Sequence, residues 1–179
     1  YSHEADIGDI DNDGDIDVLV VSHGNNTNCY FYINDGSGNF TRKILIDTIE
    51  DGYTFGSCSI SDLNNDNYKD IVLGIWKSGD NPVSSFVLFG NKTGIFNFRD
   101  RKQLPLYNKL LPKSEIRTYA TFAKYDINQD GYNDIVMSIY DDKCNQFAMQ
   151  FLKNNKDNTF TDISDSILPI NYIKDDQRM

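Results

Sequence analysis

Short hydrophobic runs recur along the chain and are separated by clusters of Asp, Asn and Gly. Residues 117–125 alternate between polar and hydrophobic positions, whereas residues 70–76 are almost continuously hydrophobic. Alternation is typical of a half-buried strand, and a short run rich in Val and Ile is typical of a buried one. Third runs follow at residues 30–33, 86–89 and 147–152, and fourth runs carry Phe40, Phe96 or Phe160. The pattern therefore predicts units of four β-strands.

Two landmarks recur three times in the same order. The first is an aspartate-rich loop that begins at Asp9, Asp62 and Asp126, between the first and second runs of each unit. The second is a Gly/Asn-rich turn at residues 34–40, 90–96 and 154–160. Repeated four-stranded units of this size are typical of β-propeller blades. We therefore expect an all-β fold of three four-stranded antiparallel blades, at residues 1–48, 49–112 and 113–163. Residues 164–179 would form a tail or begin a further repeat.

The aspartate-rich loops have the composition of calcium sites. Oxygen-bearing side chains stand at loop positions 1, 3, 5 and 9, and position 7 offers a backbone carbonyl. The predicted ligands are Asp9, Asp11, Asp13, Asp15 and Asp17 in loop one; Asp62, Asn64, Asp66, Tyr68 and Asp70 in loop two; and Asp126, Asn128, Asp130, Tyr132 and Asp134 in loop three. Calcium takes six to eight oxygen ligands, whereas zinc prefers Cys or His, which these loops lack. Three Ca²⁺ sites are expected. Loop one should bind tightest, through the side-chain carboxylates of Asp9, Asp11, Asp13 and Asp17, and loop two weakest, because it carries Lys69 and lacks the glycine at position six.

Two alternatives to this interpretation exist. An EF-hand shares the opening of the motif, but it needs a Glu at position 12 and flanking helices. Position 12 is Val20, Leu73 or Met137 here, and the flanks are predicted strands. The loops could also be acidic surface turns, because Asp-Gly and Asn-Asp are ordinary turn formers. Because the loop occurs three times, each time between the same two predicted strands of its unit, calcium sites are favoured over surface turns.

Charge and composition narrow the function classes. The net charge of −10 disfavours nucleic acid and anionic membranes as partners. No apolar run is long enough to insert into a membrane. His3 and His23 are the only histidines and stand in no catalytic motif, so we expect no catalytic residues and no enzyme activity. Cys29, Cys58 and Cys144 form no CxxC pair and are expected as buried free thiols.

The units resemble FG-GAP/VCBS repeats, the calcium-loop blades of integrin-α-type propellers. The second unit is most similar, because Phe55-Gly56 precedes its loop and residues 70–74 close it in the family's manner. The first and third units lack the Phe-Gly pair. The resemblance covers residues 1–163 and implies a seven-bladed propeller, extracellular placement, and adhesion or ligand binding. Three units cannot close such a ring, so the remaining blades of a parent protein are expected partners.

Two functions remain open. One is a calcium-stabilised module for adhesion or for recognition of a glycan or cell-surface protein; the other is the non-catalytic scaffold of a secreted carbohydrate-active enzyme. Strand order places the calcium loops and the Gly/Asn turns on one face. A ligand would lie at the opposite face, which carries residues 23–28, 77–84, 141–146 and the basic connection 102–116. A solvated crossover with scattered charge is the favoured interpretation of that connection. Trp76 and the tyrosines could stack on sugars, but packing between blades explains them better.

Overall fold

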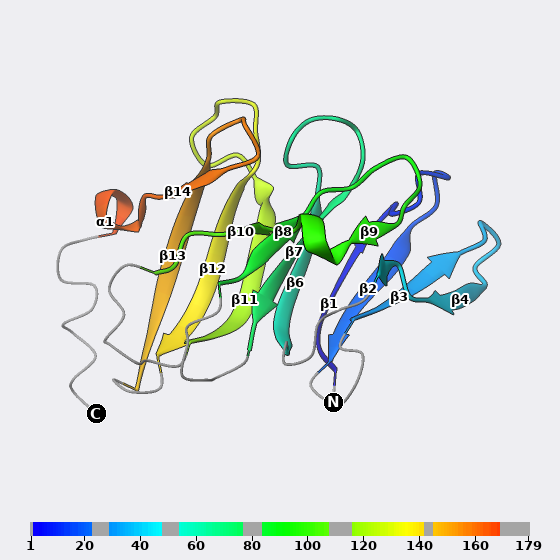
Figure 1. Cartoon of the computed structure of the whole chain (residues 1–179), viewed down its shortest axis with the longest axis horizontal. Helices are drawn as coiled ribbons and strands as arrows, with labels where there is room; N and C mark the ends of the chain where they lie inside the picture. The colour runs from blue at the N-terminus through cyan, green and yellow to red at the C-terminus, as the bar shows by residue number, and fades with distance from the viewer. Residues whose placement is uncertain are drawn as a thin grey trace.

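A computed structural model describes residues 2–22, 29–47, 54–76, 84–107, 116–141 and 145–168. Three antiparallel four-stranded sheets stand side by side in chain order (Figure 1). The first contains β1 (Ser2–Gly8), β2 (Asp17–Ser22), β3 (Cys29–Asn34) and β4 (Phe40–Lys43). The second contains β6 (Phe55–Ser61), β7 (Asp70–Ile75), β8 (Phe86–Leu88) and β10 (Lys102–Gln103). The third contains β11 (Ile116–Tyr125), β12 (Asp134–Asp141), β13 (Gln146–Asn154) and β14 (Phe160–Asp162).

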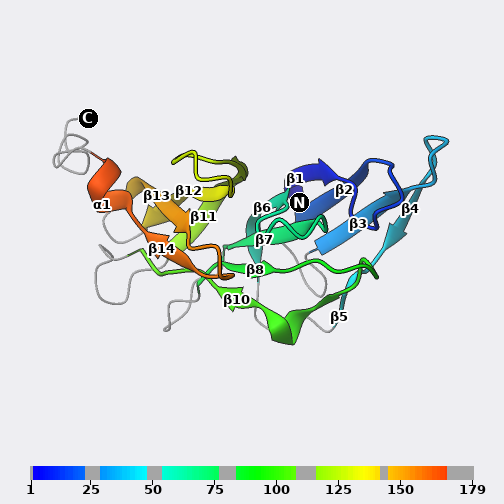
Figure 2. The same ribbon diagram turned by 90° about the horizontal axis from the view of Figure 1, so that it is seen from above.

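This all-β architecture confirms the predicted propeller-type blades. Each sheet follows the order of its strands along the chain, and Figure 2 shows the three sheets splayed like adjacent blades. Each aspartate-rich loop joins the first strand of its sheet to the second, with Gly8 opposite Asp17, Ser61 opposite Asp70 and Tyr125 opposite Asp134. The predicted boundaries at residues 48/49 and 112/113 lie outside the described residues, and the predicted division into units stays a prediction.

The fourth strand of the second sheet is not the one that carries Phe96, so that prediction is wrong. Phe96 lies in β9 (Phe96–Asn97), which pairs in parallel with β5 (Ile46–Asp47) after the first sheet. A 3₁₀ helix, η1 (Phe98–Asp100), then precedes β10, which pairs with β8. Phe96 and Phe98 are both fully buried. Both rings join the core between the first and second sheets, and their burial there accounts for the displacement of the fourth strand.

Two hydrophobic cores lie between the three sheets. In β7, Ile71 and Leu73 face the first sheet, where they join a core with Phe31. Val72 faces the other way and joins a second core with Ile135 and other residues of the third sheet. Because β7 is buried on both faces, it is continuously hydrophobic, whereas β2 alternates buried and half-buried residues.

The Phe-Gly pair of the second unit has a packing role on each side of β6. Phe55 is fully buried and makes an edge-to-face contact with Phe86, 5.8 Å between ring centroids. A Cβ at Gly56 would lie 2.3 Å from the backbone oxygen of Thr118 and 2.8 Å from the Trp76 ring. Only glycine therefore lets the first strand of the third sheet approach this closely.

The remaining features agree with a compact β-rich fold. Cys29 and Cys58 are buried free thiols, as expected, and burial raises the pKa of both; Cys144 lies outside the described residues.

The helix α1 (Ser164–Ile167) follows β14, and its Ser164 Oγ accepts the Phe151 backbone N–H (2.9 Å). None of the helices in the described ranges has the length and hydrophobicity that a membrane crossing needs.

Candidate metal sites

Loop one is curled around the carboxylate of its first residue. Asp9 accepts the backbone N–H groups of Asp13 and Gly14, both at 3.1 Å. The Asp13 carboxylate in turn accepts the N–H of Asp15 (2.9 Å). Asn12 and Gly14 adopt the left-handed region, with φ of 63° and 95°. Short acidic side chains and left-handed residues are both needed for such a tight curl.

The other two loops repeat this hydrogen-bond skeleton. The position-one carboxylates, Asp62 and Asp126, accept the N–H groups of positions five and six at 2.7–3.2 Å. The position-five carboxylates, Asp66 and Asp130, accept the N–H of position seven. Asn67 takes the place of the glycine at position six with a φ of 71°. The three loops are thus one structure built three times, and the carboxylates at positions one and five point inward.

The aspartate at position nine joins each loop to the rest of its sheet. Asp17, Asp70 and Asp134 are almost completely buried. In each, one carboxylate oxygen accepts the N–H of position two, at 2.7–3.0 Å. The other oxygen accepts an N–H at or just after the end of the third strand, from Asn34, Gly90 or Asn154 at 2.8–2.9 Å. These aspartates therefore hold the loop in place, a role that their spacing in the sequence does not reveal.

Asp11 provides a specific test of whether loop one fits a cation. Its Oδ1 atom is buried and has no hydrogen-bond partner within the described residues. Carboxylate oxygens of Asp9, Asp11 and Asp17 lie within 4.8 Å of one another. Burial, followed by the charges of Asp13 and Asp17, raises the pKa of Asp11 above its ordinary value. A cation among these oxygens would relieve both the repulsion and the missing contact, so the residues fit a metal.

The predicted ligands do not all behave alike. Within the described residues the three-acid group occurs only in loop one, because Asn64 and Asn128 replace an acid in the other loops. Asn64 and Asn128 use Oδ1 to accept the N–H of position five. Burial raises the pKa of Asp70 to about 7, although the N–H groups of Gly90 and Leu63 act in the opposite direction. Loops two and three therefore hold less negative charge than loop one.

Contacts also join neighbouring loops. Asn65 Nδ2 in loop two donates to the backbone oxygen of Gly131 in loop three (2.9 Å). Asn133 Nδ2 in loop three donates to Ser61 Oγ in the second sheet (3.0 Å). A Cβ at Gly94 would lie 3.1 Å from the Cβ of Asp11, so the Gly/Asn turn of the second unit packs on loop one. The loops and the Gly/Asn turns share one face, as strand order predicts.

The ammonium group of Lys156 is a neighbour of loop three that sequence reasoning missed. Lys156 belongs to the turn between β13 and β14, and its Nζ donates to the backbone oxygen of Asp130 (2.9 Å). The same Nζ lies 3.6 Å from Oδ2 of Asp130. The only available signal was the alignment of Lys156 with Gly36 and Lys92 in the other turns.

The opposite face carries an aromatic cluster. Trp76 contacts Tyr119 of the third sheet with 4.8 Å between ring centroids, which confirms that it packs between blades. Tyr119 and Tyr140 also contact Phe147, and Arg117 lies over the Trp76 ring. These residues lie at the end of β11 and β12 away from loop three, because Arg117 pairs with Tyr140. Phe147 remains 60% exposed. The loops predicted at this face are largely outside the described residues.

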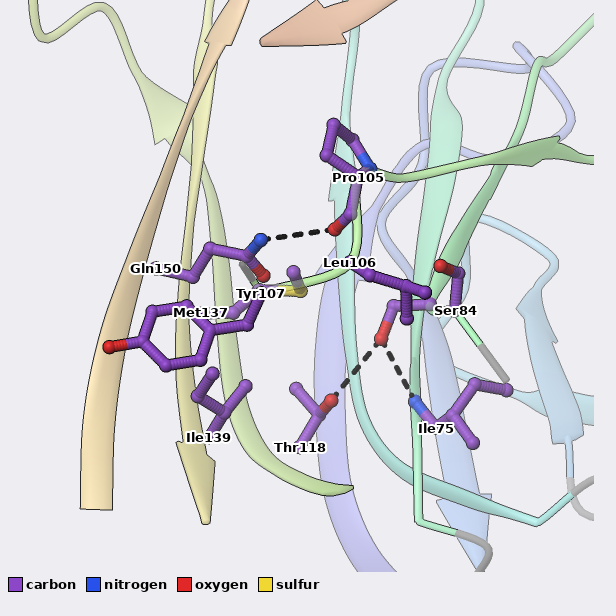
Figure 3. Close-up of a pocket in the computed structure, with 10 residues that line it drawn as sticks. Ile75, Ser84, Pro105, Leu106, Tyr107, Thr118, Met137, Ile139 and Gln150 are labelled. Atoms are coloured by element: carbon purple, nitrogen blue, oxygen red, sulfur yellow. Dashed lines mark hydrogen bonds between the residues drawn. The ribbon is translucent and has the colours of Figure 1, made fainter. Parts of the chain in front are cut away.

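A small cavity lies behind this cluster, between the second and third sheets. It is lined by Ile75, Pro105, Tyr107, Thr118, Ile139 and Gln150 (Figure 3). Gln150 Nε2 closes one side by donating to the backbone oxygen of Pro105 (3.0 Å). The cavity holds about 20 Å³, which suits one water molecule, whereas ligand pockets are typically about 300–1,000 Å³. The cavity is therefore a small gap in the packing between the second and third sheets and is too small for a ligand pocket.

Comparisons with known proteins agree with the repeat structure. Residues 9–73 match a family model described as an FG-GAP-like repeat, a range that begins at loop one and ends within β7. The chain is also 29% identical over 143 residues to integrin alpha-PS3 of Drosophila melanogaster. That alignment covers 72% of this chain, and the chain spans about 12% of the length of the relative.

Proposed function

We propose that this chain, an FG-GAP-type β-propeller repeat protein, binds calcium through its three loops as a module of an extracellular protein. The proposed ligands are the side chains at positions one, three, five and nine of each loop, with the carbonyl oxygen of position seven. Bound calcium would supply positive charge where carboxylates are crowded together. Its role in the module is structural.

The observation that carries the proposal is the unpartnered Oδ1 of Asp11. A buried carboxylate oxygen without a donor is costly unless a cation or hydrogen bond compensates it. The repetition of the hydrogen-bond skeleton in all three loops supports the same chemistry at the other two sites. Oxygen-only ligand sets on short side chains suit calcium, which binds oxygens at about 2.3–2.6 Å in flexible geometry. Magnesium demands stricter geometry and usually keeps several waters.

The parent protein that we propose is a larger propeller. Val72 of the second sheet is buried against the third, whereas Val136, at the same place after loop three, is only half-buried. A further blade would cover Val136 as the third sheet covers Val72. The similarity to an integrin alpha chain supports two further parts of this proposal. The propeller would have seven blades in total, and the protein would lie at the cell surface or be secreted. That similarity also favours a non-catalytic module.

Ligand recognition, of a glycan or a cell-surface protein, is the activity that we propose for the face opposite the loops. The exposed rings of Tyr119 and Phe147, beside the guanidinium of Arg117, support it, because aromatic and Arg side chains are typical of recognition surfaces. The alternative, a scaffold for a secreted carbohydrate-active enzyme, would use the same calcium sites. Glycan-array binding set beside polysaccharide turnover distinguishes the two.

Calcium binding is tested by following backbone amides of the ¹⁵N-labelled chain in a calcium titration. Gly14, Asn67 and Gly131 are the position-six donors of the three loops and report each site separately. We expect all three amide signals to shift with millimolar calcium but not with equal magnesium. We also expect the melting temperature to rise, since a ligand at a hundredfold excess over Kd stabilises by about 2.7 kcal/mol per site. Identical spectra and melting curves in calcium and chelator would overturn the proposal.

A further inference from the structure

Lys156 places a positive charge directly on loop three. Its Nζ donates to the backbone oxygen of Asp130 at 2.9 Å and lies 3.6 Å from Asp130 Oδ2. The same ammonium group lies over the ring of Tyr132, 5.1 Å from its centroid. Asp130 and Tyr132 occupy positions five and seven, two of the proposed ligand positions. The lysine therefore places a positive charge beside two of the proposed ligand positions, where it offsets part of the negative charge that would attract a divalent ion.

The backbone of Lys156 holds the side chain in this direction. Its φ is 68°, a left-handed conformation that glycine adopts freely and lysine does not. The matching residue in the first sheet is Gly36, with a φ of 75°. A Cβ at Gly36 would lie 2.5 Å from Oδ2 of Asp15, which is position seven of loop one. This turn position therefore points at the metal loop in both sheets, and only the third sheet places a cation there.

The second sheet provides a natural comparison. Lys92 occupies the matching turn position, two residues after the residue whose N–H binds the position-nine aspartate. It is exposed, and within the described residues no hydrogen bond or ion pair joins it to loop two. Lys92 is not left-handed; the left-handed residue of that turn is Gly94, which aligns with Gly38 and Asn158 of the other turns. A lysine at this position is thus not sufficient; the left-handed backbone of Lys156 is what directs the ammonium group to the loop.

We propose that Lys156 is a tethered cation that competes with calcium in loop three and lowers the affinity of that site. This inference rests on the proposed calcium function and deepens it. Because net ligand charge tunes calcium affinity, an ammonium group on Asp130 weakens loop three although its carboxylate count equals that of loop two. Loop one has Gly36 at the same position, so its turn places no ammonium group on the loop.

The test is a site-resolved calcium titration of the full chain and of Lys156→Gln. The Gly131 amide reports loop three, and the Gly14 and Asn67 amides report the other loops in the same sample. Because Lys156 is half-exposed, its ion pair is of the partly screened kind. We therefore expect the calcium midpoint at Gly131 to fall about twofold to fivefold, with the midpoints at Gly14 and Asn67 unchanged. Lys92→Gln is the matched control and should leave all three midpoints unchanged.

Two further variants make the inference falsifiable if Lys156→Gln disturbs the turn. Lys156→Gly keeps the left-handed backbone and should tighten loop three in the same way. Gly36→Lys should weaken loop one, and so raise the midpoint at Gly14, by more than Gly36→Met, which brings the same Cβ contact with Asp15 but no charge. If Gly131 responds to calcium with the same midpoint in every Lys156 variant, the inference is wrong while the calcium function stands. If no loop amide responds to calcium in the parent chain, both are wrong.

Discussion

Lys124 on β11 donates to Asp6 on β1 with an Nζ–Oδ1 distance of 2.6 Å, and so links the third sheet to the first. The other oxygen of Asp6 accepts the backbone N–H of Ile60 (2.7 Å), on the strand β6 that lies between them. Glu4 accepts the N–H of Cys58 in the same way (2.8 Å). Carboxylates of the first blade thus satisfy donors on the edge of β6 that no neighbouring strand reaches.

Removal of the Asp6 carboxylate should cost more stability than removal of its lysine. Asp6→Ala leaves the buried N–H of Ile60 without a partner, for an expected loss of about 1–3 kcal/mol in the free energy of unfolding. Lys124→Met should cost less than about 1 kcal/mol, because the lysine side chain is 43% exposed. Urea denaturation of both variants measures the difference. Equal losses would mean that the ion pair, and not the edge donor, is what matters.

Stability should fall as pH rises from about 4.5 to about 7, because Glu4 titrates in this range in addition to Asp70 of loop two. Burial raises the pKa of Glu4 to about 7, against the opposing effect of the Cys58 N–H and with a smaller contribution from Asp6. Between pH 4.5 and 7 the folded chain keeps a proton on Glu4, whereas the unfolded chain releases it. The free energy of unfolding therefore decreases as pH rises through this range. The carboxyl group is half-buried, so the expected loss is on the order of 1 kcal/mol.

The measurement is the free energy of unfolding against pH for the parent chain and for Glu4→Gln. The amide of glutamine can still accept the Cys58 N–H but does not titrate, so the Glu4→Gln curve should be flatter between pH 4.5 and 7. Asp100→Asn, at an exposed position in η1, is the control and should retain the parent slope. Parallel curves for Glu4→Gln and the parent would contradict the assignment.

The aspartate at position nine should stabilise the chain without any metal. Asp17→Asn removes one of two acceptor oxygens and so leaves the N–H of Ile10 or of Asn34 unpaired. We expect a loss of about 1–3 kcal/mol in chelator. Asp13→Asn removes the same charge from the same loop but can still accept the Asp15 N–H, so in chelator it should change stability little. A small effect of Asp17→Asn in chelator would show that its role depends on metal.

The sequence predicted the parts of this structure that are periodic. The strands on either side of each loop are predicted by alternating hydrophobic positions and by the turn residues that bound them. The loops themselves are predicted by the regular spacing of Asp and Asn. The fourth strand of the second sheet was misassigned, because Phe96 matches Phe40 and Phe160 in spacing. In space, Phe96 instead stacks on Phe31 of the first sheet, 6.1 Å between ring centroids. A long-range contact of this kind leaves no periodic signal.

The same limit applies to the candidate sites. Spacing predicts Asp17, Asp70 and Asp134 as ligands, but the hydrogen bonds that they accept at the end of the third strand depend on a register that only the fold sets. The contact between Lys156 and Asp130 likewise joins residues 26 positions apart. The predicted weakness of loop two relied in part on its missing glycine, yet Asn67 adopts the required left-handed backbone. Affinities therefore cannot be ranked from the composition of each loop alone.

The outward faces of the first and third sheets should make the isolated chain self-associate. Phe122 pairs with Val136, on the side of the third sheet that faces away from the second, and is 48% exposed. Ile7 on β1 is 56% exposed. The two end faces differ, so they would join head to tail rather than as a closed symmetric pair. Sedimentation velocity should therefore show oligomers that grow with concentration.

Phe122→Asp should reduce these oligomers, whereas Ile44→Asp, which alters an exposed side chain outside the sheets, should not. A parent chain that stays monomeric at all concentrations would mean that these faces are tolerated in water and that no further blade is needed to cover them.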